Sequence, residues 1–285
     1  MGGIFVKKIA LVADSTSDLT AAMRKDYDVH VIPLKIRFGQ EEYYDGELNA
    51  EEFYQRLKQA SELPTSSQPA PEDFIKLYKS LLQKYDEIIS IHLSSNLSGT
   101  VNAAWIAAES FKAKVHVVDS KTISLGIGLM VNEAAVSIRE GLNTKQVLER
   151  IHNARKNIET IFTLNTLEYL QKGGRIGKVA GMVGSLLNIK PVIRVNEEGI
   201  YVPAGKVRSQ DKALEQIIHN LQEFAGNRKV KALAIAHGAA QEAANKLKSA
   251  LETTFGISAS FFTQVSAVIG VHTGPGTVGA AVYYE

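Results

Sequence analysis

The first half of the chain alternates between short apolar runs and segments with a helical period. Apolar, β-branched runs at 7–14, 29–39, 87–93 and 115–118 have the length and composition of buried strands. Segments with helical character lie between or after them, at 19–27, 50–60, 71–85, 99–111 and 126–141. Strands that alternate with helices favour βαβ crossovers, so we predict a mostly parallel sheet in this half.

The pattern changes after about Lys156. Strand signals at 158–164 and 190–208 are separated by a glycine-hinged basic segment with Arg175 and Lys178, which leads into a predicted apolar helix with glycines at Gly181 and Gly184. The sequence "NEEG" at 196–199 is typical of a hairpin turn. Helices are predicted at 211–224 and 240–255, and strands at 230–238, 258–265 and 278–284. The whole chain is therefore predicted to be an α/β protein, with an N-terminal, mostly parallel βαβ domain at 1–160 and a C-terminal mixed α+β domain at 161–285. The boundary is placed near 157–162.

Composition and charge narrow the class of protein. The chain has 285 residues and a formal net charge of +2, which gives no overall electrostatic signature of nucleic-acid binding. It has no cysteine, so disulfides, thiol nucleophiles and thiolate metal sites are excluded. It also shows neither an apolar run of about 18 residues nor the apolar core of a signal peptide. We therefore expect a cytoplasmic protein without a membrane span.

Two glycine-rich segments resemble nucleotide-binding motifs, but neither meets the spacing and context that such a motif requires. Gly274, Gly276 and Gly279 spell G-x-G-x-x-G, but only six residues follow Gly279, too few for the helix, second strand and ribose carboxylate of a dinucleotide site. The segment "GGRIGKV" has three residues between Gly173 and Gly177, one fewer than a phosphate loop needs, and valine follows its lysine. Neither segment predicts a nucleotide site.

Hydroxyl-rich junctions follow three of the predicted strands. Those at 13–20 and 118–126 are best explained by capping of the next helix, because serine and aspartate are common there. The junction after the strand at 87–93 has Ser94, Ser95, Ser98 and Thr100 around Gly99, and either a helix cap or an anion site at a helix N-terminus would account for it.

A second hydroxyl cluster lies between two prolines. Thr65, Ser66 and Ser67 are predicted to form a stiff loop that either contacts a ligand or simply leads into the next helix. Among the seven histidines no metal-ligand spacing occurs, so no metal site is predicted. His92 is expected to be a buried structural residue, whereas His272, predicted to lie on an open glycine loop, is the better functional candidate.

Together these segments resemble one family, the DegV family of bacterial fatty-acid-binding proteins, also called FakB. The similarity rests on "ADSTSDLT", "PTSSQPAPEDF", "IHLSSNLSGTVNAA", "VVDSKTISLG", "LEYLQKGGRIGKVAGMVGSLLNIKPVI", "GKVRSQDKAL" and "HTGPGTVG", which occur in family order along essentially the whole chain.

The resemblance implies a DegV-like fold with a long-chain fatty acid (C14–C18) held in a pocket between the two domains. It implies that Ser98 and the residue before Ser-Gln-Pro hold the carboxylate. The family threonine at that place is Ser66 here, with Thr65 one position earlier. The family's His-Thr-x-Pro-Gly-Thr-like loop maps onto His272 to Thr277, which makes His272 a further ligand contact.

The family also implies a partner and a division of labour. FakB proteins present the acid to a separate ATP-dependent kinase, FakA, which forms acyl phosphate, so this chain is expected to be a carrier without catalytic residues or cofactor. Basic positions at Arg175, Lys178, Lys206 and Arg208 are the expected docking patch. Neither nucleic acid nor a membrane span is expected, and transient membrane contact stays open.

Two other functions remain open on sequence alone. A serine hydrolase would use Ser98 with His272 and an acid such as Asp14 or Asp119, and it requires the serine and histidine to lie within hydrogen-bond reach. A phosphate or sugar-phosphate binder would use the helix N-terminus near Ser98 and would need a polar pocket. The apolar run at 179–189 favours the lipid.

Overall fold

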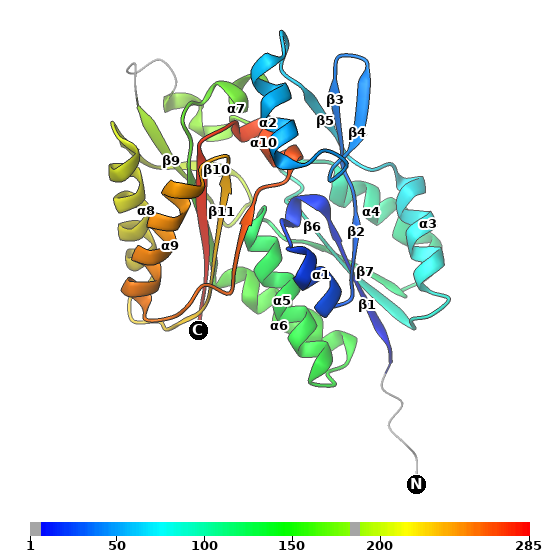
Figure 1. Cartoon of the computed structure of the whole chain (residues 1–285). Helices are drawn as coiled ribbons and strands as arrows, with labels where there is room; N and C mark the ends of the chain where they lie inside the picture. The colour runs from blue at the N-terminus through cyan, green and yellow to red at the C-terminus, as the bar shows by residue number, and fades with distance from the viewer. Residues whose placement is uncertain (1–6, 183–188) are drawn as a thin grey trace.

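The computed structural model describes residues 7–182 and 189–285 and contains three sheets (Figure 1). The predicted α/β class is confirmed, with a parallel sheet first and a mixed sheet second. Gly184 and most of the apolar run at 179–189 lie outside the described residues. No helix in the described parts of the chain is both long and apolar enough to cross a membrane.

The first sheet has four parallel strands in the order β2-β1-β6-β7. They are β1 (Ile9–Asp14), β2 (Val29–Ile32), β6 (Glu87–His92) and β7 (Val115–Asp119). From β1 the chain goes first to one side, to β2, and then returns to the other side, to β6. The carboxyl ends of β1 and β6 therefore meet where the strand order reverses, which is the place where open α/β sheets bind ligands.

The second sheet has six strands in the order β10-β9-β8-β13-β11-β12. All its pairs are antiparallel except β11 with β12, as expected for hairpins combined with a crossover. Its strands are β8 (Ile158–Thr163), β9 (Lys190–Val195), β10 (Tyr201–Val207), β11 (Val230–Gly238), β12 (Phe261–Gln264) and β13 (Thr277–Tyr284). The change of sheet thus comes at β8, while the domain limits at 160 and 161 stay a prediction.

Helices form layers on and between these two sheets (Figure 1). The outer face of the first sheet carries α3 (Pro71–Leu81) and α4 (Thr100–Ala108), and that of the second carries α8 (Gln210–Ala225) and α9 (Gln241–Phe255). Between the sheets lies α5 (Leu125–Arg139), packed against α6 (Thr144–Lys156). The largest apolar cluster joins α5 to strands of both sheets, so the two predicted domains share a core.

A small third sheet and the helices that pack with it cover one end of the layers (Figure 1). A small antiparallel sheet, ordered β4-β3-β5, consists of β3 (Lys35–Phe38), β4 (Glu41–Tyr44) and β5 (Thr65–Ser67). It packs with α2 (Ala50–Gln59) and α10 (Ala267–Thr273) in an apolar cluster of their own. The other short elements are α1 (Ala21–Asp26), α7 (Glu168–Lys172) and the 3₁₀ turns η1 (Ser15–Ser17), η2 (Glu109–Phe111) and η3 (Gly177–Met182).

Four local predictions are wrong. The junction at 118–126 does not cap the next helix through a side chain, because the Ser124 hydroxyl donates to Asp18 and makes no capping bond at the start of α5. The segment 29–39 is two strands, β2 and β3, in different sheets, because Pro33 interrupts the run. Thr65 to Ser67 form strand β5 rather than a loop, since they pair with β3. His272 lies in the last turn of α10 rather than on an open loop, and that helix is capped by Ser266, whose hydroxyl accepts from the Ile269 amide.

Candidate ligand-binding site

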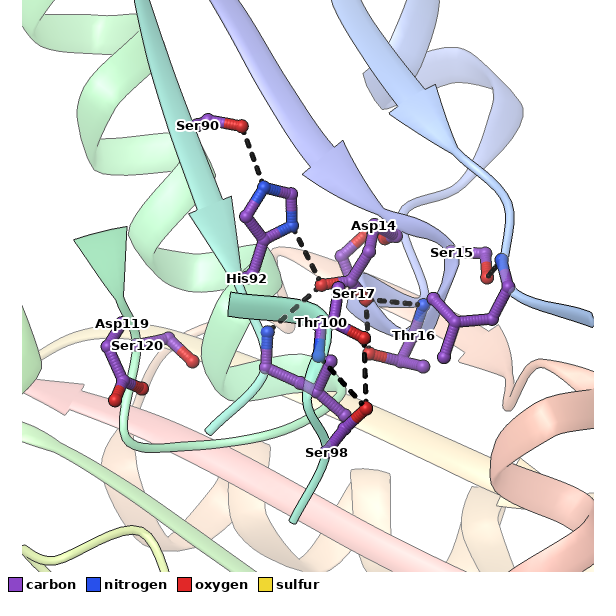
Figure 2. Close-up of polar contacts among 12 residues, drawn as sticks. Asp14, Ser15, Thr16, Ser17, Ser90, His92, Ser98, Thr100, Asp119 and Ser120 are labelled. Atoms are coloured by element: carbon purple, nitrogen blue, oxygen red, sulfur yellow. Dashed lines mark hydrogen bonds and ion pairs between the residues drawn. The ribbon is translucent and has the colours of Figure 1, made fainter. Parts of the chain in front are cut away.

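The loops that follow β1 and β6 are joined by a buried polar network (Figure 2). Asp14 Oδ1 accepts from the Thr16 amide at 3.0 Å and from the Thr16 hydroxyl. Its Oδ2 accepts from the Leu93 amide at 3.0 Å and lies 3.1 Å from His92 Nδ1. One carboxylate therefore fixes both loops, and its bond from the Thr16 amide is the predicted cap, here at the start of the 3₁₀ turn η1.

His92 continues this network into the core and has no free ring nitrogen. Its Nε2 lies 2.7 Å from Ser90 Oγ, which accepts from the Tyr78 hydroxyl at 2.8 Å. A single pattern satisfies every group: Tyr78 donates to Ser90, Ser90 donates to His92 Nε2, and His92 Nδ1–H donates to Asp14. His92 is thus a buried structural histidine, as expected, and Asp14 is engaged with it.

Ser98 ends the loop after β6 and stands at the start of α4. Its hydroxyl lies 2.9 Å from the Thr100 hydroxyl and 3.3 Å from the Thr100 amide. The neighbouring Gly99 lies directly against Gln68, since a Cβ there would be 2.1 Å from Gln68 Oε1 unless that side chain moved. This close approach holds the segment that follows β5 against the Ser98 loop.

Ser66 and His272 form a direct pair across the site. Ser66 Oγ in β5 and His272 Nε2 in α10 are 2.7 Å apart. Burial, with a smaller effect from the nearby Arg175 charge, lowers the pKa of His272 to about 4. The imidazole is therefore neutral near pH 7. Its Nδ1 is buried without a hydrogen-bond partner, beside Gly173, where a Cβ would lie only 2.4 Å away.

These side chains line one small cavity, which we call the polar chamber. It encloses about 30 Å³. Its lining residues with polar side-chain atoms are Thr16, Ser66, Ser98, Arg175, Tyr201, His272 and Thr273. Leucine, isoleucine and valine side chains such as Leu34, Leu93 and Val268 complete the wall. Neutral donors and one arginine thus face a cavity whose other walls are apolar.

A second cavity, the apolar chamber, adjoins the first. It encloses about 40 Å³ and lies against β8, β11 and β13 of the mixed sheet. The two chambers share four lining residues, Ile123, Tyr201, Ile269 and Thr273. The hydroxyl cluster and the apolar space between the two sheets are therefore direct neighbours, with these four residues between them.

The glycine-rich turn before β13 has a structural explanation. Gly274 and Gly276 have φ of +69° and +90°, and a Cβ on Gly276 would lie 1.8 Å from Asn165 Nδ2. Strand β13 follows the turn, where a dinucleotide site needs a helix. Only the start of the family-like loop, His272 and Thr273, lines the polar chamber.

The structure separates the predicted site residues into two groups. Ser66, Ser98 and His272 line the polar chamber, whereas Thr65 is exposed and, as the neighbour of Ser66 in a strand, points to the opposite face. Thr16 was not predicted as a ligand contact, because its junction reads as a helix cap. The signal that was available is its place at the carboxyl end of a parallel strand.

The four predicted docking residues are exposed and come from two neighbouring segments. Arg175 and Lys178 lie at η3 or just before it, Lys206 and Arg208 lie at the end of β10, and η3 packs on β10. Arg175 also lines the polar chamber, so it connects the chamber with the surface. Lys178 Nζ lies 3.6 Å from Glu198. Their role in docking stays a prediction.

The geometry required for the hydrolase is not formed. His272 bonds Ser66 rather than Ser98, and its Nδ1 has no acid partner. Asp14 pairs with His92, and Asp119 accepts from Ser95 and pairs with Lys121 at 2.8 Å. Among the described residues, no group of three histidines, aspartates or glutamates is arranged to hold a metal ion.

Comparisons with known proteins agree over nearly the whole chain. A family model described as an uncharacterised protein of the DegV family matches residues 8–285. A DegV domain-containing protein of Clostridium acetobutylicum is 36% identical over 281 residues, covering 98% of this chain and 99% of that protein. A solved structure described as fatty acid binding of a DegV family protein, from Thermus thermophilus, has a TM-score of 0.93 and 36% identity, covering 98% of this chain and 100% of that one. DegV from Bacillus subtilis, described as a fatty acid binding protein, has a TM-score of 0.88 and 32% identity, with coverage of 98% and 100%.

Proposed function

This chain belongs to the DegV family, and from that premise we propose that it binds a long-chain fatty acid (C14–C18) and presents the carboxylate to a partner kinase. One observation carries the lipid part of this proposal. The polar chamber, with its neutral hydroxyls and imidazole, adjoins a chamber lined almost wholly by apolar atoms. A molecule with one polar end and an apolar tail matches that order of surfaces, and a long tail also requires side chains around the chambers to move apart, because the two enclose only about 30 Å³ and 40 Å³.

We assign the carboxylate to Ser66 and Ser98. The Nδ1 atom of His272 is buried without a hydrogen-bond partner. A buried acceptor without a partner costs less free energy than a buried N–H donor without one, so the ring proton belongs on Nε2. Nε2–H then donates to Ser66 Oγ, and the Ser66 hydroxyl proton is free to donate to a carboxylate. Ser98 has the same freedom when Thr100 donates to it.

Neutral donors suit a carboxylate that must later react. A positive charge in a bidentate pair would hold the carboxylate more tightly and lower its nucleophilicity. Most of the binding free energy would come from the tail, because a buried methylene contributes about 0.8 kcal/mol and about 15 of them about 10 kcal/mol before other costs. The head contacts then serve mainly to orient one carboxylate oxygen toward the mouth.

The partner in this proposal is an ATP-dependent kinase of the FakA type. Attack of a carboxylate oxygen on the γ-phosphorus of ATP breaks the bond to ADP and gives an acyl phosphate. In the proposal the kinase supplies the nucleotide site, and this chain supplies the oriented acid. Arg175 supports a mouth at this place, because it is exposed and also lines the polar chamber.

A hydrolase built on Ser66 and His272 is the second candidate, since only this serine of the site bonds the imidazole. A fluorophosphonate that labels Ser66 would support it. Absence of labelling, with tight fatty acid binding, supports the carrier. A phosphate binder is disfavoured because the adjoining chamber is apolar.

Native mass spectrometry of the protein purified from a bacterial host tests the proposal directly. We expect a stoichiometric adduct that extraction identifies as a C14–C18 fatty acid. A protein that carries no lipid and also ignores added palmitate and oleate would overturn the proposal. Incubation of the loaded protein with ATP and a FakA-type kinase should then yield acyl phosphate, and failure of that step alone would overturn only the kinase part.

A further inference from the structure

The apolar chamber is bounded at one side by a thin partition with a third, larger cavity behind it. This outer cleft encloses about 380 Å³ between α1, α2 and the turn that leads into α10. Within the described chain, Val265 lines both the apolar chamber and the outer cleft. Its side chain, only 6% exposed, therefore separates the two spaces.

Hydrogen bonds on both sides hold this partition in place. The Val265 amide donates to the His237 carbonyl at 2.9 Å, and the next amide, of Ser266, donates to Asp18 Oδ1 at 2.7 Å. Asp18 Oδ2 accepts from the Ser124 hydroxyl. Asp18 faces the outer cleft and Ser124 faces the apolar chamber, so this pair belongs to the same partition as Val265.

The two sides of the partition differ in chemistry. The chamber side is apolar, whereas the cleft has the carboxyl groups of Asp18 and Asp45 together with the apolar side chains of Leu19, Leu48 and Phe53. Each methylene that a hydrocarbon tail buries in the chamber makes its binding more favourable, up to the partition. A longer tail must displace the wall and approach polar groups, which opposes binding. Leu48 and Phe53 would still offer apolar contact to a tail that passed through.

We propose that Val265 is the residue that limits the length of the bound acyl chain, by closing the apolar chamber against the outer cleft. The inference rests on the proposed fatty acid binding and deepens it. The residues shared with the polar chamber are Ile123, Tyr201, Ile269 and Thr273, and they mark the side from which a tail enters. Among the described residues, Val265 is instead the one that the apolar chamber shares with the outer cleft, so the terminal methyl group of the longest acid that fits is expected to lie against it.

The test is the dissociation constant of saturated fatty acids from C12 to C22, measured for the full chain and for variants. In the wild type, affinity should rise about fourfold with each added methylene and then stop rising at one length. In Val265→Ala the rise should continue to longer acids, so that the preference for C20 over C16 increases about tenfold or more. Val265→Leu should stop the rise at a shorter acid.

Val282→Ala is the matched control, because Val282 is fully buried on the other side of the mixed sheet and lines neither chamber. It should lower stability without moving the length at which affinity stops rising. The same limiting length in wild type and both Val265 variants would overturn the inference while leaving fatty acid binding intact. A wild type that binds no acid of any length would overturn both.

Discussion

Ser66 and His272 are 206 positions apart in the chain, yet Ser66 Oγ and His272 Nε2 lie within 2.7 Å of each other. The pair connects the small antiparallel sheet with α10, the helix that joins β12 and β13 of the second sheet. With Ser98 from the loop after β6, it places three distant segments around one chamber. The following predictions test what each part of this arrangement contributes.

Ser66→Ala should weaken fatty acid binding by about tenfold to a hundredfold, the effect of one hydrogen bond to a charged group. Titration calorimetry or displacement of a fluorescent fatty acid measures it. Thr65→Ala is the matched control, because its side chain is exposed and does not line the chamber. If Thr65→Ala weakened binding as much as Ser66→Ala, the assignment of the head group to Ser66 would be wrong.

His272 should make the fold less stable below pH 6.5. Its pKa is about 4 in the folded protein, below the ordinary value of 6.5, so the unfolded chain binds more protons between these two values. The free energy of unfolding should fall by about 2–3 kcal/mol as the pH drops from 6.5 to 4. Urea unfolding of wild type and His272→Gln measures it, and equal pH dependence of the two proteins would contradict the prediction.

Asp18 should act in the opposite direction. Burial raises its pKa to about 8, so the folded protein binds the extra proton between about pH 4 and pH 8. The folded protein is stabilised by its higher affinity for this proton. The stabilisation is fully present below pH 3.8 and is lost as the pH rises through 8. Relative to wild type, Asp18→Asn should therefore gain at least about 1 kcal/mol of stability between pH 5 and pH 9. The exposed Asp26→Asn should show no such trend.

Gly276→Ala should destabilise the protein strongly. Its φ of +90° disfavours any side chain, and the new Cβ would lie 1.8 Å from Asn165 Nδ2. We expect a loss of at least about 2 kcal/mol, with a lower melting temperature. Gly181→Ala, where a Cβ meets nothing within 4 Å, should change stability by less than about 0.5 kcal/mol. Similar losses in both variants would refute the steric argument.

Arg208→Glu should slow acyl phosphate formation without changing fatty acid affinity. Arg208 is exposed and does not line the polar chamber, so a charge reversal there is expected to act on kinase docking and not on the bound acid. We expect a rise in the apparent KM for the loaded protein, about fivefold or more at low salt. Lys145→Glu, an exposed lysine in α6, is the control and should behave like wild type.

The alternation of apolar runs and helical periods was sufficient to predict a parallel sheet followed by a mixed one. Such periods arise from local backbone geometry and from which face of each element is buried. The hairpin turn at 196–199 and the caps at Asp14 and Thr20 are local for the same reason, and the structure has them. The family similarity was readable too, because its segments occur in order along the chain.

Only the tertiary structure decided which hydroxyls share a cavity. Ser66 faces the chamber and Thr65 does not, because the pairing of β5 with β3 sets the face on which each side chain lies, and no local signal marked that three-residue strand. The same holds for Thr16, because the sequence around it would be the same whether the residue served a helix cap or lined a ligand chamber. His272 was expected on a loop because glycines surround it, but packing against α2 and α7 lets that segment form a helix. The partition at Val265 depends on three segments that meet only in the folded chain, so no pattern of residues along the chain could have indicated it.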